Sequence, residues 1–134
     1  MPLIKIEEVI NWTGIDPETP KTYNHIERWI SCPSKHGPNS YALRVSGDAM
    51  TSSHGKSYPP GCIIFVDPSQ ATTARSGDQI IARMHRDNSI VFKSLILDAG
   101  AKFLRSLNTA YPTIDAGFDV MGKVIGKYEC EDNP

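Results

Sequence analysis

The sequence lacks the features of a membrane or secreted protein. No apolar run reaches the roughly 18 residues that a membrane-spanning helix needs, and the N-terminus has no apolar signal-peptide core. The three cysteines, Cys32, Cys62 and Cys130, are an odd number without a Cys-x-x-Cys pair. A zinc site built from Cys32 and His36 would have no second half-motif. We therefore expect reduced thiols in a cytoplasmic protein, with no metal and no cofactor.

An excess of charge of either sign is also missing. The chain has 14 basic and 15 acidic residues, which gives a formal net charge of -1. A nucleic-acid surface usually carries a basic patch, so this balance does not indicate that the chain itself binds DNA. Its 134 residues are enough for one domain with its own core.

From residue 41 onward, the apolar pattern is typical of short β-strands. Runs rich in β-branched residues are separated by Gly, Pro, Asp and Asn, and they cover residues 41–45, 62–66, 79–84, 89–95, 102–107 and 120–128. Asp87-Asn88 and Asp98-Ala99-Gly100 are hairpin signals. The pattern predicts a mostly β fold, a partly open β-barrel or sandwich with little helix.

Residues 1–25 are predicted to be an N-terminal segment and linker, followed by a domain over residues 26–134. Ile6, Val9 and Ile10 could share a helix face, whereas residues 3–6 could equally begin a strand. The turn residues that follow, Gly14, Pro17 and Pro20, indicate an exposed linker.

Six blocks in residues 46–126 resemble the motifs of one protein family. In chain order they are Ser46–Met50, Tyr58–Pro68, Ser76–Arg83, Ile90–Leu95, Leu107–Pro112 and Val120–Gly126. Their order is similar to that of the LexA/UmuD-type Ser-Lys autopeptidases, and Glu27–Ile30 resembles lambda-type phage repressors within that family. The resemblance implies a LexA-like C-terminal domain, the regulatory and self-association part of a phage or prophage repressor that keeps lysogeny.

The resemblance also assigns a catalytic site in which one residue is unexpected. The family has a nucleophilic serine in the pattern Gly-x-Ser-Met, and this position holds Ala49. By the same resemblance Lys93 is the general base, and the amides of Asp48 and Ala49 form the oxyanion hole. A lysine is a base only when neutral, so its pKa must fall well below about 10.4, which burial among apolar residues can cause. A methyl group cannot attack a carbonyl, so the chain is predicted to be inactive, whether Ala49 is a Ser→Ala substitution or a natural feature.

The substrate in this family is the chain itself, cut at an Ala-Gly or Cys-Gly bond. Thr13-Gly14 stands at the corresponding place here. Threonine is bulkier and β-branched, so we expect slow cleavage at this bond even with a serine at position 49. Two other functions stay open: a Ser-Lys autopeptidase captured in an inactive form, and a UmuD-like accessory protein, against which Glu27–Ile30 argues.

The expected partners follow from the resemblance and from symmetry. We expect a homodimer or larger assembly, because two-fold pairing is the commonest form of self-association. Induction would use RecA-stimulated self-cleavage or capture by an antirepressor protein. Operator DNA would be bound by an N-terminal helix-turn-helix domain of the parent protein that this chain does not contain. The predicted dimer surface consists of Tyr111, Pro112, Phe118, Val120, Val124 and Tyr128. Val120, Val124 and Tyr128 are expected on one face of the last strand, and the alternative is that this strand is core.

Overall fold

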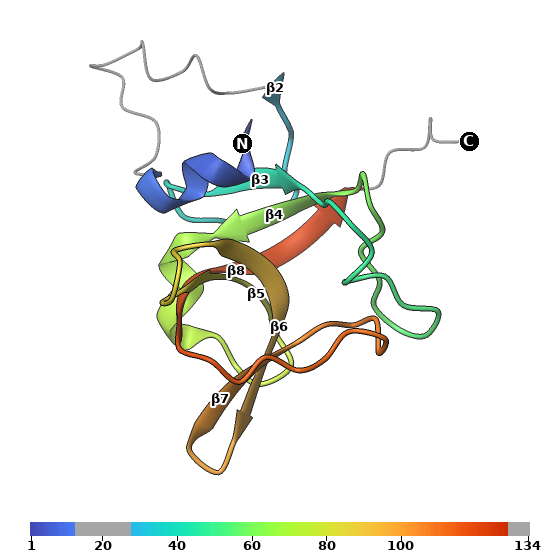
Figure 1. The fold of residues 1–134 in the computed structure, drawn as a ribbon. Helices are drawn as coiled ribbons and strands as arrows, with labels where there is room; N and C mark the ends of the chain where they lie inside the picture. Colours follow the sequence, from blue (N-terminus) through green and yellow to red (C-terminus); the bar gives the residue numbers. More distant parts are fainter. Residues whose placement is uncertain (13–27, 129–134) are drawn as a thin grey trace.

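One curved, eight-stranded sheet forms the body of the molecule, as the computed structural model shows for residues 1–12 and 28–128 (Figure 1). The elements, in chain order, are β1 (Pro2–Leu3), 3-10 helix η1 (Ile6–Asn11), β2 (Arg28–Trp29), β3 (Tyr41–Arg44), β4 (Ile63–Asp67), 3-10 helix η3 (Pro68–Thr73), β5 (Gln79–Met84), β6 (Ile90–Asp98), β7 (Ala101–Arg105) and β8 (Phe118–Tyr128). The strand order is β2-β1-β3-β4-β8-β5-β6-β7. The predicted mostly β fold with little helix is confirmed.

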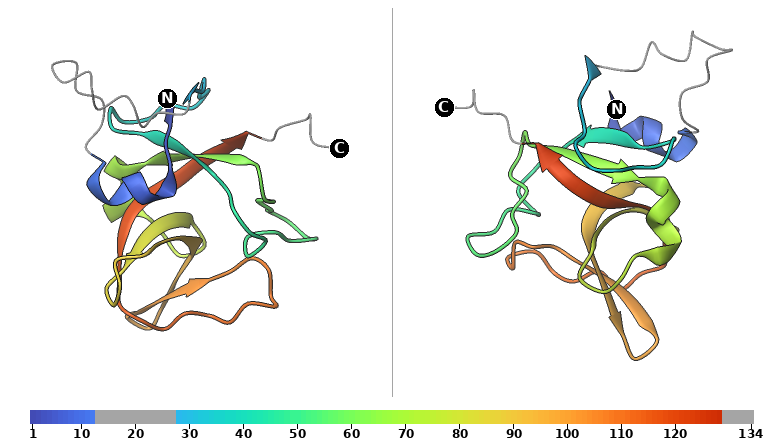
Figure 2. Two further views of the ribbon diagram at one scale, coloured as in Figure 1. Left: turned by 45° about the horizontal axis from the view of Figure 1, so that its top comes forward. Right: turned by 180° about the vertical axis from the view of Figure 1, so that it is seen from behind.

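Tight turns join the strands where the sequence predicted them. Asn88, between β5 and β6, has a φ of 59°, and Ala99 and Gly100, between β6 and β7, have φ values of 52° and 84°. These positive values are the conformations that short hairpin turns require. The β6–β7 hairpin projects from the body of the molecule in Figure 1 and in the right-hand view of Figure 2.

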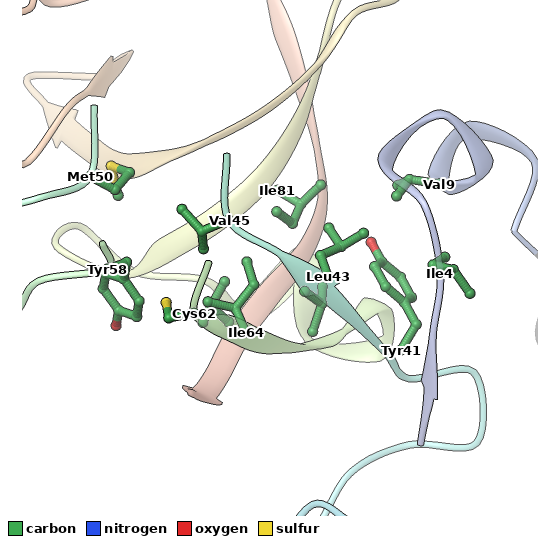
Figure 3. Close-up of a cluster of buried hydrophobic side chains, with 12 residues drawn as sticks. Ile4, Val9, Tyr41, Leu43, Val45, Met50, Tyr58, Cys62, Ile64 and Ile81 are labelled. Atoms are coloured by element: carbon green, nitrogen blue, oxygen red, sulfur yellow. The ribbon is translucent and has the colours of Figure 1, made fainter. Parts of the chain in front are cut away.

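The largest core cluster includes side chains of η1, β3 and β4. It includes Tyr41 and Leu43 of β3, Ile64 of β4, and Ile4 and Val9 of the N-terminal segment, all of them buried. Figure 3 shows the side chains of Ile4 and Val9 on the same side of β3 as Tyr41 and Leu43. Because Met50 also belongs to this cluster, the core holds the end of the turn that contains Ala49.

Residues 2–11 are part of the folded domain, which corrects the domain boundary predicted at residue 26. β1 lies between β2 and β3, pairing antiparallel with β2 and parallel with β3. Leu3 is fully buried, and Val9 is 3% exposed. Both alternatives considered for this segment occur in succession, a strand and then a helical turn. The remaining part of the predicted linker, residues 13–25, lies outside the described residues.

Two bulges change the faces of β8. Its pairing with β5 passes from Ile81↔Gly122 to Ala82↔Val120, and its pairing with β4 passes from Phe65↔Gly126 to Val66↔Val124. Each extra residue reverses the alternation of side chains. The expectation that Val120, Val124 and Tyr128 share one face is therefore wrong. Val124 belongs to the first core cluster, whereas Val120 packs against a second cluster that contains Phe118.

Gly122 permits the close approach of β8 to the end of β4. A methyl group on Gly122 would lie 2.6 Å from Val66 Cγ1 and 3.4 Å from the backbone of Pro68. We expect Gly122→Ala to lower the free energy of unfolding by about 1–3 kcal/mol, because extra atoms in a packed core force neighbours to move. Gly126→Ala is the matched control on the same strand, since its methyl group would meet Phe65 at an ordinary 3.5 Å. Urea unfolding of both variants tests this, and equal losses would contradict it.

Candidate active site

A groove of about 430 Å³ is lined by two of the predicted site residues, Ala49 and Lys93. Its walls are residues 4–7, 43–46, 49–50 and 90–93. Ala49 and Lys93, which are distant in the sequence, therefore line one groove beside the N-terminal segment. The groove combines apolar side chains such as Ile90 and Phe92 with the amine of Lys93.

The turn that contains Ala49 is tight and well anchored. Gly47 has a φ of 76°, a conformation that side chains rarely adopt, and the Thr51 amide donates to the Asp48 carbonyl at 3.1 Å. Met50, which is 2% exposed, fixes the end of the turn in the core. In the part of the chain that the structure describes, the amides of Asp48 and Ala49 have no hydrogen-bond acceptor. Their role as the oxyanion hole, which the family resemblance implies, stays a prediction.

Lys93 reaches this groove from β6 and is partly removed from water. Its Nζ donates a hydrogen bond to Ser106 Oγ at 2.7 Å and lies 5.6 Å from the centre of the Tyr111 ring. Burial lowers the pKa of Lys93 below its ordinary value of 10.5. This is the direction that a lysine needs in order to act as a base.

The turn at residues 106–111 contacts both parts of the site, a role that the sequence did not reveal. The main-chain amide of Asn108 donates to the Ala49 carbonyl at 2.9 Å, and its side-chain amide donates to the Asp48 carbonyl at 3.2 Å. The Tyr111 hydroxyl donates to the Asp48 carboxylate. That hydrogen bond and the nearby negative charge raise the pKa of Tyr111. The Asn-x-x-Tyr spacing was visible only as part of a family resemblance.

The residues of the predicted dimer surface are not all at the surface. Phe118 is 3% exposed and Val124 is 9% exposed, and each packs in a core cluster, so these two are core rather than surface residues of the single chain. Tyr111, Pro112 and Tyr128 are exposed, and Val120 is half-buried. Tyr128 lies beside Trp29, which is 58% exposed and which the sequence did not identify as a surface residue.

The structure also bears on the cysteines, on metal-binding clusters and on membrane-spanning helices. The candidate bond Thr13-Gly14 lies outside the described residues. Cys32 and Cys62 are thiols rather than a disulfide. Residues 1–12 and 28–128 contain no cluster of three or more His, Cys, Asp or Glu side chains that could hold a metal ion. No helix among them has the length and apolar character needed to cross a membrane.

A mostly β domain that sets a half-buried lysine beside a tight turn has the layout of a Ser-Lys peptidase domain. Comparison with protein families matches residues 11–128 to the Peptidase S24-like family, and the chain belongs to that family. The nucleophile position predicted from the family pattern is Ala49.

Several curated proteins are similar to the chain. Repressor protein C2 of Salmonella phage P22 is 40% identical over 101 residues, covering 75% of this chain and 45% of the relative. The HTH-type transcriptional regulator for conjugative element R391 from Providencia rettgeri is 35% identical over 115 residues, covering 85% and 52%. Prophage repressor CohE of Escherichia coli (strain K12) is 35% identical over 120 residues, covering 87% and 48%. The chain spans about half the length of these relatives.

Proposed function

We propose that this chain is the regulatory and self-association domain of a transcriptional repressor from a phage, prophage or related mobile element. The main support is that a chain of the Peptidase S24-like family, with relatives named as repressors, holds Lys93 and Ala49 in one groove. The groove keeps the expected base and oxyanion-hole amides but has a methyl group at the nucleophile position. The domain thus works here through association rather than cleavage.

The proposed partners follow from this role. A helix-turn-helix domain elsewhere in the parent protein would bind operator DNA, and pairing of this domain would let two such domains occupy two half-sites together. Induction would break the pairing, by RecA-stimulated cleavage in a serine-containing form or by an antirepressor protein. The place of work would be the cytoplasm of the bacterial host.

The proposed self-association surface is the aromatic patch formed by Trp29 and Tyr128. Both side chains are about half exposed, at 58% and 48%, and they line a hollow of about 280 Å³ with Ile30 and Ser31. Large exposed aromatic side chains are typical anchors of protein interfaces. The patch retains Tyr128 of the originally predicted surface and replaces the buried Phe118 and Val124 with Trp29.

Replacing both aromatic side chains should weaken the dimer without unfolding the chain. We expect the unaltered chain to be a dimer in sedimentation velocity at high micromolar concentration. Trp29→Ser with Tyr128→Ser should raise the dissociation constant by about tenfold to a hundredfold, since interface anchors contribute about 1–3 kcal/mol or more.

Leu97→Ser is the control for this experiment. Leu97 is 44% exposed but lies on the projecting β6–β7 hairpin, away from the patch. It should leave the dissociation constant unchanged. A monomer in the unaltered chain at high micromolar concentration would remove the self-association role altogether.

The second candidate function is peptidase activity in a serine-containing form of the chain. The observation that favours it is the lowered pKa of Lys93, together with its position in the groove. A solvent-exposed surface lysine would show neither property. This candidate is tested by restoring the hydroxyl at position 49.

A further inference from the structure

We propose that the turn at residues 106–111 is the positioning element of this site, with Asn108 fixing the oxyanion-hole peptide and Ser106 fixing the amine of Lys93. The inference rests on the proposal that the groove is a Ser-Lys peptidase-type site. It concerns residues that act through the reacting groups rather than on a substrate directly.

Asn108 acts on the peptide group between Asp48 and Ala49. This group is planar and trans, so its carbonyl and its amide point in opposite directions. The side-chain amide of Asn108 holds the Asp48 carbonyl at 3.2 Å, and the Ala49 amide is therefore turned away from Asn108. The main-chain amide of Asn108 holds the Ala49 carbonyl at 2.9 Å and fixes the next peptide group in the same way. Two consecutive peptide groups of the site are thus oriented by one residue.

Asn108 is itself held in place. Its side-chain carbonyl accepts from the Ala110 amide at 3.0 Å, and its main-chain carbonyl accepts from the Tyr111 amide at 3.1 Å. Because the side-chain oxygen is engaged within the turn, the NH₂ group of the same amide points the other way, to the Asp48 carbonyl. Such orientation before reaction is what makes an oxyanion hole effective.

Ser106 acts on Lys93. Its side chain is 3% exposed, and its oxygen accepts from Lys93 Nζ at 2.7 Å. A serine hydroxyl can accept from an ammonium or from a neutral amine, so the contact persists in both protonation states. The remaining directions of the amine, including the lone pair of the neutral form, are left for the groove.

Tyr111 contacts both Asp48 and Lys93. Its hydroxyl binds the Asp48 carboxylate, and its ring lies 5.6 Å from Lys93 Nζ. The turn therefore sets the relative position of Lys93, which lies on β6, and of the peptide at 48–49, which lies in the turn after β3. Small changes in such positioning have large effects on a reaction rate.

The first test needs no activity. In the unaltered chain, the ¹⁵N order parameter of the Ala49 amide should be that of rigid backbone, about 0.85, and Asn108→Asp should lower it toward about 0.6. Aspartate keeps the acceptor for the Ala110 amide, removes the donor to the Asp48 carbonyl and adds a negative charge there. Asn108→Ala is a second variant with the same expected loss. Thr109→Ala, which changes an exposed side chain in the same turn, is the control. An unchanged order parameter in both Asn108 variants would overturn the role of Asn108.

The second test measures the titration of Lys93 by NMR of its side-chain carbon next to Nζ. A hydrogen bond to the ammonium favours the charged form, so Ser106→Ala should lower the pKa of Lys93 further. A pKa that stays the same or rises would overturn the role of Ser106.

The third test uses Ala49→Ser as the parent. Adding Ser106→Ala should shift the pH midpoint of self-cleavage downward and yet lower the plateau rate, by about tenfold to a hundredfold. If Ser106 only stabilised the fold, its loss would not shift the pH midpoint of self-cleavage downward while lowering the plateau rate. Adding Asn108→Ala should lower the plateau by a similar factor with the midpoint unchanged. If Ala49→Ser itself never cleaves, the peptidase proposal fails, while the two NMR tests still decide the positioning role.

Discussion

Ala49→Ser is expected to turn an inert chain into one that slowly cuts itself at alkaline pH. The groove already contains Lys93, whose pKa is lowered by burial, so the missing component is the attacking hydroxyl. Removing a nucleophile from a complete site costs about a million-fold in a well-studied serine protease, so restoring it should have an effect of many orders of magnitude. The rate should rise with pH as Lys93 loses its proton, and the midpoint of this rise should lie below the ordinary lysine value of 10.5. Mass spectrometry over a pH series measures both the cut and its midpoint.

Two control proteins make this result specific. The unaltered chain should remain one intact species after long incubation at about pH 10, close to the ordinary lysine pKa. A discrete cut within residues 9–16 of that chain would contradict the role given to Ala49. Adding Lys93→Ala to Ala49→Ser should abolish the reaction, and persistence would remove Lys93 from the base role. Rapid cutting at Thr13-Gly14 would show that threonine is no obstacle there.

Asp67→Ala should lower the free energy of unfolding by about 3 kcal/mol, because it leaves several hydrogen-bond donors without their acceptor. Asp67 is 2% exposed at the end of β4. Its carboxylate accepts from the amides of Gly37 and Ser69, from Ser69 Oγ and from Gln70 Nε2. These bonds fasten the loop before β3 and the start of η3 to the sheet. Asp87→Ala, at an exposed turn carboxylate, is the control and should cost far less.

The same carboxylate gives the fold a defined sensitivity to acid. Burial alone raises the pKa of Asp67, but the hydrogen bonds from Ser69, Gly37 and Gln70 outweigh it and lower the pKa to about 2. A lowered pKa stabilises the folded state above the unfolded value of about 3.9, and this contribution is lost as the pH falls toward 2. The unfolding free energy of the unaltered chain should therefore decline between about pH 4 and pH 2, and that of Asp67→Asn should decline less. Parallel declines in urea titrations at several pH values would contradict this.

The fold could be predicted because its signals are local. β-Branched runs mark β4 and β5, and the turn residues Asn88 and Gly100 mark the two hairpins around β6. Lys93 and the turn at Ala49 could be found from spacing within a family pattern, and the structure places both at one groove. What was predicted incorrectly depends on contacts between distant segments. Nothing in residues 118–128 alone reveals the two bulges that bury Val124 and separate it from Val120.

The role of Asn108 was hidden for a similar reason. An asparagine before a Tyr-Pro pair is an ordinary turn residue in the sequence, and its function depends on which carbonyls lie opposite it. Only the folded chain brings the Asp48 and Ala49 carbonyls within reach. The exposure of Trp29 likewise follows from the place of β2 at the edge of the sheet, where one side of a short strand has no neighbour among the described strands.

The position of β1 has a consequence for any cut at Thr13-Gly14. Leu3 is fully buried between β2 and β3, the Ile4 amide donates to the Ala42 carbonyl at 3.0 Å, and Val9 anchors η1 in the core. Breaking the chain after η1 would leave all of these contacts in place. The severed N-terminal piece would remain docked as a complementing fragment, and its lifetime on the domain would be set by the dissociation of β1 from the sheet. Peptide-bond hydrolysis and physical separation would then be two events with two rates, and the slower one would decide how long the two halves stay together.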